Sequence, residues 1–503
     1  MSCTSGSSVA LLSSKEVEST ATPAVRPSFA RHVLLFSFAN LVALVGNGVL
    51  TFLLPRLLSM ESYGYYRLFV LYGGFAGVLH LGLLDGALIR WAARPQQRMR
   101  AEVLNSLGFL LVEHAAILVP ATAVLALLFH RQPWFFLVVA IALYAVVFNV
   151  STLGQFALQA DKLFGLLSLV TVMNPVLLLT AVVALHYWRH LTLGTLVAAF
   201  ILCWLLAAIP VWGLLLRKFS AGRRSVRHAW GIGAYNLRVG WRVLLALLLT
   251  NVALSLDRIA VSLSFSIRDF AIYSLAATAL AVVNTIILSV SRVVFPYLSD
   301  GLSPETQVRA YWWGEACLVG LWAISLAGYF PLHWLITWLL PNYIPSLPVL
   351  RLLMLATGLT GIIHILQSNF FRSTFRLGQL LLGCAVGLVA ALVLLTLARR
   401  TGQLSMMALA MLGAIGLWWM LNERLLKPLT GGSSWNLVRT TLVYTGCALW
   451  FVFCTSWNSL VAAAGAYLLV AAVVVFLSYR SILRTVPRLR LFPLLGLGAE
   501  MPE

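Results

Sequence analysis

The chain has 503 residues, of which 61% are hydrophobic and only 10% are charged. A soluble protein carries about a quarter charged residues, so this composition excludes a soluble globular fold. The net charge of +20 does not indicate a nucleic-acid partner, because the basic residues lie at the ends of apolar runs, where membrane proteins carry their topology signals.

The apolar runs predict an all-α integral membrane protein with about fourteen transmembrane helices. A bilayer core about 30 Å thick needs roughly 20 apolar residues per helix. The runs here are long and continuous, unlike the alternating segments of about ten residues that build a barrel. The predicted spans are 33–55, 67–89, 103–128, 134–156, 164–186, 192–216, 243–265, 270–296, 311–339, 347–370, 377–398, 404–421, 439–456 and 459–479.

The spacing of these spans divides the chain into six parts. We expect a disordered cytoplasmic tail at 1–32, a six-helix lobe at 33–216, a basic cytoplasmic linker at 217–242, a second six-helix lobe at 243–421, two additional transmembrane helices at 439–479 and a cytoplasmic tail at 480–503. Residues 58–68 align with 265–275 without a gap, and Ser, Tyr and Leu recur at three of the aligned positions. This match predicts that the two lobes are related by a parallel repeat, as in many transporters.

Basic residues predict that both termini are cytoplasmic. With that orientation, 25 of the 35 Lys and Arg residues lie on the cytoplasmic side. Eight lie outside, at Arg56, Arg67, Arg131, Arg189, Arg268, Arg351, Arg399 and Arg400, and two lie within spans, at Arg258 and Arg292. An excess of this size is typical of cytoplasmic loops.

Enzyme and metal signatures are missing from the sequence. The six cysteines have no metal-ligand spacing, and five of them lie inside apolar runs, where small residues pack between helices. There is no phosphate-binding glycine loop, no HExxH and no GxSxG. We therefore expect neither a catalytic site, a metal site nor a cofactor.

Polar side chains within the spans are the candidate functional residues, because ionisable groups at membrane depth are costly. Helical periodicity places Asn251, Ser255 and Arg258 on one face. Two further stripes are predicted, formed by Ser274, Thr278, Thr285, Ser289 and Arg292 and by Thr357, Thr360, His364, Gln367 and Ser368. The three stripes predict a wet cavity in the second lobe. The alternative is that the hydroxyls bond to their own helix carbonyls and join helices together.

Arg258 is the deepest cation, about 10 Å from the outer end of its predicted span. Its guanidinium is suited to bind a phosphate through paired hydrogen bonds, and it is equally suited to pair with an acid such as Asp257 or Glu113 on another surface. Arg292 lies four residues from Pro296 and is expected to extend toward the headgroups.

The first lobe contains further ionisable residues within its spans. Asp85 lies near a span end, where it is expected to be hydrated or paired with Arg90. Glu113 and His114 lie mid-span and form either a proton relay or a buried structural pair. Together with Asp257, these residues are the candidates for ion coupling.

Several motifs resemble those of the bacterial polysaccharide (O-antigen) flippases of the multidrug/oligosaccharidyl-lipid/polysaccharide exporter superfamily. The likeness lies in Phe36-Ser37-Phe38-Ala39-Asn40, Leu54-Pro55-Arg56-Leu57-Leu58, Glu61-Ser62-Tyr63-Gly64-Tyr65-Tyr66 and Leu81-Gly82-Leu83-Leu84-Asp85-Gly86, and again in Leu256-Asp257-Arg258 and Val294-Phe295-Pro296-Tyr297-Leu298-Ser299. The spacing of the remaining spans extends the resemblance to about residues 33–480.

The resemblance implies a flippase of the bacterial inner membrane that moves a polyprenyl-diphosphate-linked oligosaccharide outward for polysaccharide export. It implies two lobes that rock about a central cavity and contact membrane lipids. It also implies that the protein works together with a polysaccharide polymerase and other export machinery. The first alternative is a drug or organic-cation antiporter of the same superfamily, in which Glu113 and Asp257 would be essential. The second is a membrane glycan polymerase or ligase, which the short external loops disfavour.

Overall fold

The computed structural model describes residues 27–92, 96–132, 134–219, 226–280, 304–374, 376–431 and 434–483. These residues form helices and turns and contain no strand, as the apolar runs predict. Within this part of the chain, eleven helices are long and apolar enough to cross a membrane, or twelve if one bent pair counts as a span. The chain is thus built as a multi-pass membrane protein, and the predicted count of fourteen is not confirmed.

The first half of the chain follows the predicted spans except at the second one. Its helices are α1 (Pro27–Leu57), α2 (Met60–Gly73), the 3-10 helix η1 (Ala76–His80), α3 (Leu83–Ala92), α4 (Gln96–Phe129), α5 (Phe135–Ala160), α6 (Phe164–Tyr187) and α7 (Leu193–Phe219). The span predicted at 67–89 is broken and bends by 59°. The break lies at Leu81 and Gly82, whose positive φ angles no helix accommodates.

The second half contains more breaks than the apolar runs indicate. Its helices are α8 (Val226–Ala253), α9 (Leu256–Ser264), α10 (Ile267–Ala279), α12 (Pro304–Leu326), α13 (Tyr329–Leu339), the 3-10 helix η2 (Pro341–Tyr343), α14 (Ser346–Gly361), the π-helix η3 (Ile362–Gln367), α15 (Ser368–Ser373), α16 (Leu377–Arg399), α17 (Leu404–Thr430), α18 (Ser434–Cys454) and α19 (Leu460–Leu483). The span predicted at 243–265 is two helices, and the one predicted at 270–296 continues beyond the described residues.

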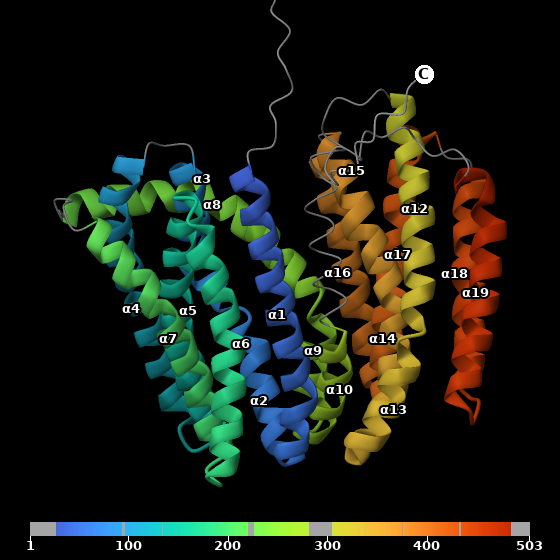
Figure 1. The fold of residues 1–503 in the computed structure, drawn as a ribbon, viewed down its shortest axis with the longest axis horizontal. Helices are drawn as coiled ribbons and strands as arrows, with labels where there is room; N and C mark the ends of the chain where they lie inside the picture. The colour runs from blue at the N-terminus through green and yellow to red at the C-terminus, as the bar shows by residue number, and fades with distance from the viewer. Residues whose placement is uncertain are drawn as a thin grey trace, which may run out of the picture.

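The helices form two groups that converge at one end and diverge at the other (Figure 1). One group contains α3 to α7, and the other contains α12 to α17, with α18 and α19 at its outer side. Helix α1 runs between them from the divergent end to the convergent end, and α2, α9 and α10 lie between them at the convergent end. Tyr467 of α19 donates a 2.8 Å hydrogen bond to the Ala323 carbonyl of α12, which fixes the additional helices to the second group.

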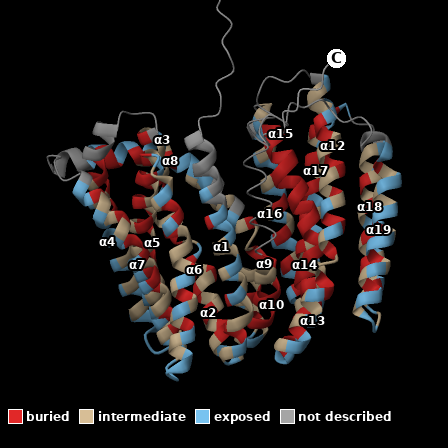
Figure 2. Ribbon diagram, viewed as in Figure 1, coloured by how far each residue is buried: buried red, intermediate tan, exposed pale blue. Residues whose placement is uncertain are grey.

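Burial identifies a central helix in the second group (Figure 2). The span formed by α14, η3 and α15 has 89% of its most apolar window buried, whereas the corresponding windows of α16 and α19 are 22% and 17% buried. The exposed residues of those outer helices are large and apolar, as expected where lipid covers the surface. The second group is therefore a bundle packed around α14.

Most of the segment predicted as a linker at 217–242 is helical. Helix α8 runs across the divergent end of the first group and packs on α3 (Figure 1). Glycines make this approach close: a Cβ on Gly86 would lie 2.0 Å from the Asn236 carbonyl oxygen, and one on Gly240 would lie 1.9 Å from the Gly82 carbonyl oxygen. The segment therefore belongs structurally to the first half, because its backbone contacts that of α3 directly.

We expect Gly86→Ala to destabilise the protein, because the added methyl overlaps backbone that must move to admit it. Overpacking of this kind costs about 1–3 kcal/mol. Gly108→Ala in α4 is the matched control, since nothing lies within 4 Å of its added Cβ. Thermal unfolding of the purified variants checks this, and equal unfolding midpoints would contradict the docking of α8 on α3.

Candidate functional site

The two segments that the sequence alignment pairs adopt the same local structure at the convergent end. Ser59 caps α2 by accepting a 3.2 Å hydrogen bond from the Ser62 amide, and Ser266 caps α10 by accepting a 3.1 Å bond from the Asp269 amide. Both caps have extended backbone angles, as N-caps require. The similarity is local, and the repeat of whole lobes stays a prediction.

These segments also contact each other and join the two groups of helices. Arg268 binds Glu61 through Nη2 at 2.7 Å and Nε at 2.9 Å, so aligned positions of the two segments form an ion pair. A Cβ on Gly64 would lie 2.5 Å from the Ile267 carbonyl oxygen. Tyr63 packs edge-on against Tyr343, with ring centroids 5.7 Å apart. The convergent end is therefore tightly closed.

Arg258 lies in the first turn of α9, and α9 lies beside α10 near this closed end (Figure 1). Its Nη2 donates to the Ser255 hydroxyl at 2.9 Å and to the Leu254 carbonyl at 3.3 Å. Within the described residues, its guanidinium forms no ion pair with a carboxylate, so neither Asp257 nor Glu113 is its structural partner. The predicted grouping of Ser255 with Arg258 is confirmed. Asn251 lies on α8, beyond the helix break, so a common helical face does not apply to it.

Asp257 attracts the Arg258 guanidinium electrostatically, but its hydrogen bonds do not come from the arginine side chain. Its Oδ2 accepts a 2.8 Å hydrogen bond from the buried Tyr273 hydroxyl, and its Oδ1 accepts a 2.7 Å bond from the Arg258 backbone amide. The carboxylate also lies in the first turn of α9, where the helix dipole favours a negative charge. Asp257 therefore orders the start of α9 without forming an ion pair with the Arg258 guanidinium.

Arg67 is a second cation that the sequence analysis placed on the external side. It lies instead within α2, half-buried, and its Nε is buried without a hydrogen-bond partner. It is close enough to Arg258 for the two charges to repel each other. The predicted span begins at residue 67, whereas α2 begins at Met60. Arg67 therefore lies within the helix and not at its end. One arginine from each half thus contributes to the same region.

A cavity of about 70 Å³ adjoins Arg258 and extends into the second half. It is lined by Asp257 and Arg258 of α9, by Thr357 and Thr360 of α14 and by apolar residues of α10 and α17. Both threonine hydroxyls also donate to carbonyls of their own helix, at 2.7 and 2.9 Å. The predicted cavity and the alternative of local hydroxyl bonding are therefore both present at these positions.

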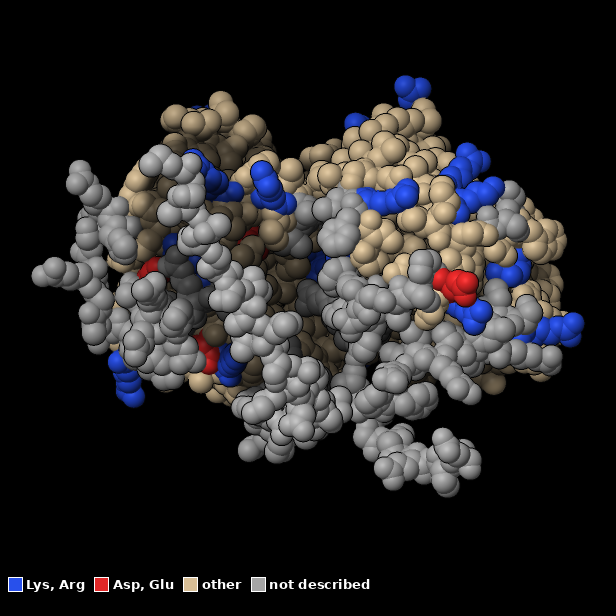
Figure 3. Space-filling model, turned by 90° about the horizontal axis from the view of Figure 1, so that it is seen from above, with Lys and Arg blue, Asp and Glu red and all other residues tan. Residues whose placement is uncertain are grey.

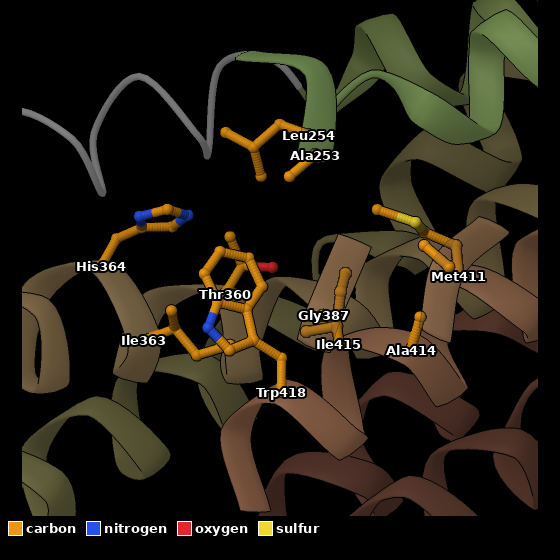
Figure 4. Close-up of a pocket in the computed structure, with 11 residues that line it drawn as sticks. Ala253, Leu254, Thr360, Ile363, His364, Gly387, Met411, Ala414, Ile415 and Trp418 are labelled. Atoms are coloured by element: carbon orange, nitrogen blue, oxygen red, sulfur yellow. The ribbon is translucent and has the colours of Figure 1, made fainter. Parts of the chain in front are cut away.

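His364 lies in a neighbouring small pocket, on the π-helix η3 (Figure 4). Its ring packs edge-on against Trp418 at 5.8 Å between centroids, beneath Ala253 and Leu254. Gln367, predicted on the same stripe, lies away from both pockets in a buried polar cluster with Glu423. The stripe is therefore divided between two environments, and Arg292 lies outside the described residues.

The candidate residues of the first half form separate contacts. Arg90 pairs with Glu102 at 2.7 Å, and Asp85 lies 3.9 Å from His80, so the expected pairing of Asp85 with Arg90 is wrong. The His114 ring bonds at 2.9 Å to Asn149, whereas both carboxylate oxygens of Glu113 are buried without a hydrogen-bond partner. His114 and Glu113 therefore do not form the structural pair that the sequence analysis considered.

A larger cavity in the first half was not predicted. It measures about 320 Å³ and lies among α1, α5, α6 and α7. Its polar lining is uncharged and comes from Asn47, Gln155, Thr171 and Asn174, beside the aromatic rings of Phe200 and Trp204. Sequence reasoning looked for polar stripes along single helices, and three amides on three different helices give no signal within any one helix.

Comparison with known proteins establishes the fold. The structure is similar to the lipid II flippase MurJ in an inward closed conformation, with a TM-score of 0.67 and 11% identity over 90% of this chain and 100% of that chain. It is also similar to a multidrug resistance MATE family transporter of the MOP superfamily in an inward-facing conformation, with a TM-score of 0.51 and 15% identity over 80% of this chain and 100% of that chain. No family model and no curated protein sequence matches the chain.

Tyr273→Phe is expected to lower the stability of the second half, because it removes the hydroxyl that donates to the buried Asp257. A buried acceptor that loses its partner costs about 1–3 kcal/mol. Tyr187→Phe serves as the control, since Tyr187 is exposed at the end of α6. The unfolding midpoint of each purified variant is the measurement, and a shift no larger than that of the control would remove Asp257 from this role.

Proposed function

We propose that this protein is a flippase that moves a polyprenyl-diphosphate-linked oligosaccharide across the bacterial inner membrane for polysaccharide export. The observation that carries the proposal is the pair formed by Arg67 and Arg258. The two cations come from opposite halves and repel each other. Asp257 also attracts Arg258, but neither guanidinium forms an ion pair with a carboxylate in the described part of the chain. An anion held between them would relieve this repulsion.

A diphosphate fits these residues chemically. Each guanidinium presents a planar set of donors that matches two phosphate oxygens. Ser255 holds the Arg258 side chain, and the buried Nε of Arg67 has an unused donor. A hydrogen bond between a guanidinium and a phosphate is strong where water is scarce. Two arginines also carry two positive charges, which is enough to bind one diphosphate headgroup.

The uncharged cavity of the first half suits a sugar. Its four amide and hydroxyl side chains offer both donors and acceptors, and its aromatic rings offer apolar faces. Its volume of about 320 Å³ leaves room for a small part of a glycan. The likeness to a lipid II flippase supports a substrate that carries a lipid.

Alternating access follows from the closed end and the divergent end. The contacts of α2 with α10 close one side, while the molecule is hollowed between its halves when seen from the other side (Figure 3). We propose that the halves are six-helix lobes related by a parallel repeat and that they rock about this contact. We also propose that the protein works together with a polysaccharide polymerase.

One observation favours a second candidate, the antiporter of the same superfamily. Glu113 lies within the membrane-spanning part of α4 with both carboxylate oxygens lacking hydrogen-bond partners. A proton or an organic cation would compensate such a group. In an antiporter, Glu113→Gln would abolish transport and Arg258→Ala would not.

The proposed orientation places the divergent end in the cytoplasm, where the described surface shows more Lys and Arg than Asp and Glu (Figure 3). A reporter that is active only in the periplasm should therefore be silent when fused after Glu503. The same reporter fused after Arg400, in the predicted external turn between α16 and α17, should be active. Activity at Glu503 would overturn the predicted orientation.

Arg258→Ala should abolish glycan export while the protein still accumulates in the membrane, because the headgroup loses its paired hydrogen bonds. Arg258→Lys keeps the positive charge but loses the paired N–H donors of the guanidinium, so it should reduce export partially. We expect Arg67→Ala to behave like Arg258→Ala, since the two guanidinium groups act on one anion. The measurement is export of glycan divided by the amount of protein in the membrane.

A purely structural role for Arg258 gives a different pattern. In that case Arg258→Ala would reduce the amount of folded protein, and the double variant with Asp257→Asn would restore both the amount and the export. Unchanged export in Arg258→Ala, or full rescue by the second substitution, would defeat the binding role. Arg400→Ala is the control, because Arg400 is exposed at the end of α16 and takes no part in the contact between α2 and α10.

A further inference from the structure

A second polar cluster lies buried in the second half, and none of its residues lines the cavity beside Arg258. Its centre is formed by two carboxylates, Glu315 of α12 and Glu423 of α17, which are 1% and 7% exposed. The two acids are 108 positions apart in the chain and close enough in space to repel each other. Buried like charges of this kind are rarely both ionised without a counter-charge.

Glu423 is held by donors from two helices. It accepts a hydrogen bond from the Tyr311 hydroxyl and a 2.9 Å bond from the Gln367 amide. The orientation of Gln367 is itself fixed, because its amide oxygen accepts a 2.9 Å bond from Asn422. All of these donors are neutral, so they orient the Glu423 carboxylate without neutralising its charge.

Glu315 is only partly satisfied. It bonds to the Thr440 hydroxyl of α18, and Thr440 also bonds at 2.9 Å to the hydroxyl of Tyr479. Its second oxygen, Oε2, is buried and has no hydrogen-bond partner. An unpartnered carboxylate oxygen beside a second carboxylate is chemically suited to bind a cation or a proton.

One cationic side chain lies near Glu315 and Glu423 but does not neutralise them. Arg439 of α18 attracts Glu315 electrostatically, but its guanidinium lies over the Tyr479 ring at 4.8 Å from the centroid. Its Nε and Nη2 have no hydrogen-bond partner, and within the described residues it forms no ion pair with Glu315. The other titratable groups around the pair are Tyr311 and Tyr479, and η3 contributes only neutral Gln367 beside it.

The charges of the cluster therefore do not balance. Among the described residues, two buried carboxylates are accompanied by one guanidinium, so one negative charge of this cluster has no counter-charge in that part of the chain. We propose that Glu315 and Glu423 bind a single monovalent cation, either a proton shared by the pair or an alkali metal ion held by their oxygens. Carboxylate and hydroxyl oxygens are the ligands that hard cations prefer. The site is independent of the substrate proposed above.

The test uses the purified full-length protein and its thermal unfolding midpoint. The midpoint is measured from pH 5 to pH 9 in sodium, potassium and choline chloride at equal ionic strength. If the site holds an alkali ion, sodium or potassium should raise the midpoint above that in choline at high pH. If it holds a proton, the native state binds that proton more tightly than the unfolded state, so the midpoint should fall as pH rises in every salt.

Glu315→Gln and Glu423→Gln each remove one negative charge with little change in shape. Either variant should lose the dependence on salt or on pH that the wild type shows. Glu305→Gln is the control on the same helix, because Glu305 is exposed near the start of α12. It should behave as the wild type does.

Two outcomes would overturn the proposal. The first outcome concerns the unfolding midpoint of the wild type. It would contradict the proposal if it changed with alkali ions and with pH no more than the midpoint of the Glu315→Gln/Glu423→Gln double variant does. The second is loss of the dependence in Glu305→Gln as well, since the effect would then not come from the buried pair. If Glu315→Gln does not fold, Glu423→Gln and the wild-type titration decide the question.

Discussion

The close approach of α2 and α10 is the contact on which the arrangement of the two halves depends. Gly64 permits it, because any side chain at that position would meet the Ile267 carbonyl. The ion pair between Glu61 and Arg268 contributes less, since the side chains are 53% and 67% exposed and such pairs are worth about 0–1 kcal/mol. Backbone packing therefore closes this end, and the ion pair aligns α2 with α10. The contact fixes the relative position of the two helices but contributes little to stability.

Breaks in the helices are the second feature that the structure must accommodate, because free backbone groups are costly in a membrane. One side chain from another helix and one from the broken span itself satisfy the break in the second span. Asn149 of α5 donates a 2.8 Å hydrogen bond to the Ala76 carbonyl, and the His80 ring accepts a 3.1 Å bond from the Gly82 amide. His114 holds Asn149 in place. A residue that the sequence presents as a candidate for proton transfer thus serves the bent helix.

The sequence predicted the helical membrane fold well, because the length of an apolar run directly measures its capacity to span a bilayer. It did not predict where the helices break, since hydropathy does not register the backbone angles of residues such as Leu81. It placed Arg67 outside because the preceding residues of α2 are polar and aromatic. It also missed Glu315 and Glu423. Glu315 lies within the predicted span 311–339 and was passed over, whereas Glu423 lies beyond the predicted span end at 421 although α17 continues to Thr430. That the two acids meet follows only from tertiary packing.

The break between α8 and α9 has a mechanical consequence. Helix α8 is fastened to the first half through backbone contacts of Gly86 and Gly240, whereas α9 belongs to the second half. Any rotation of one half against the other must therefore be absorbed in the two residues that join these helices, Leu254 and Ser255. Those same residues hold the Arg258 guanidinium. In the proposed function, a rotation at this joint would therefore also move the guanidinium that is proposed to bind the anion, so the affinity for the anion would change with the relative orientation of the two halves.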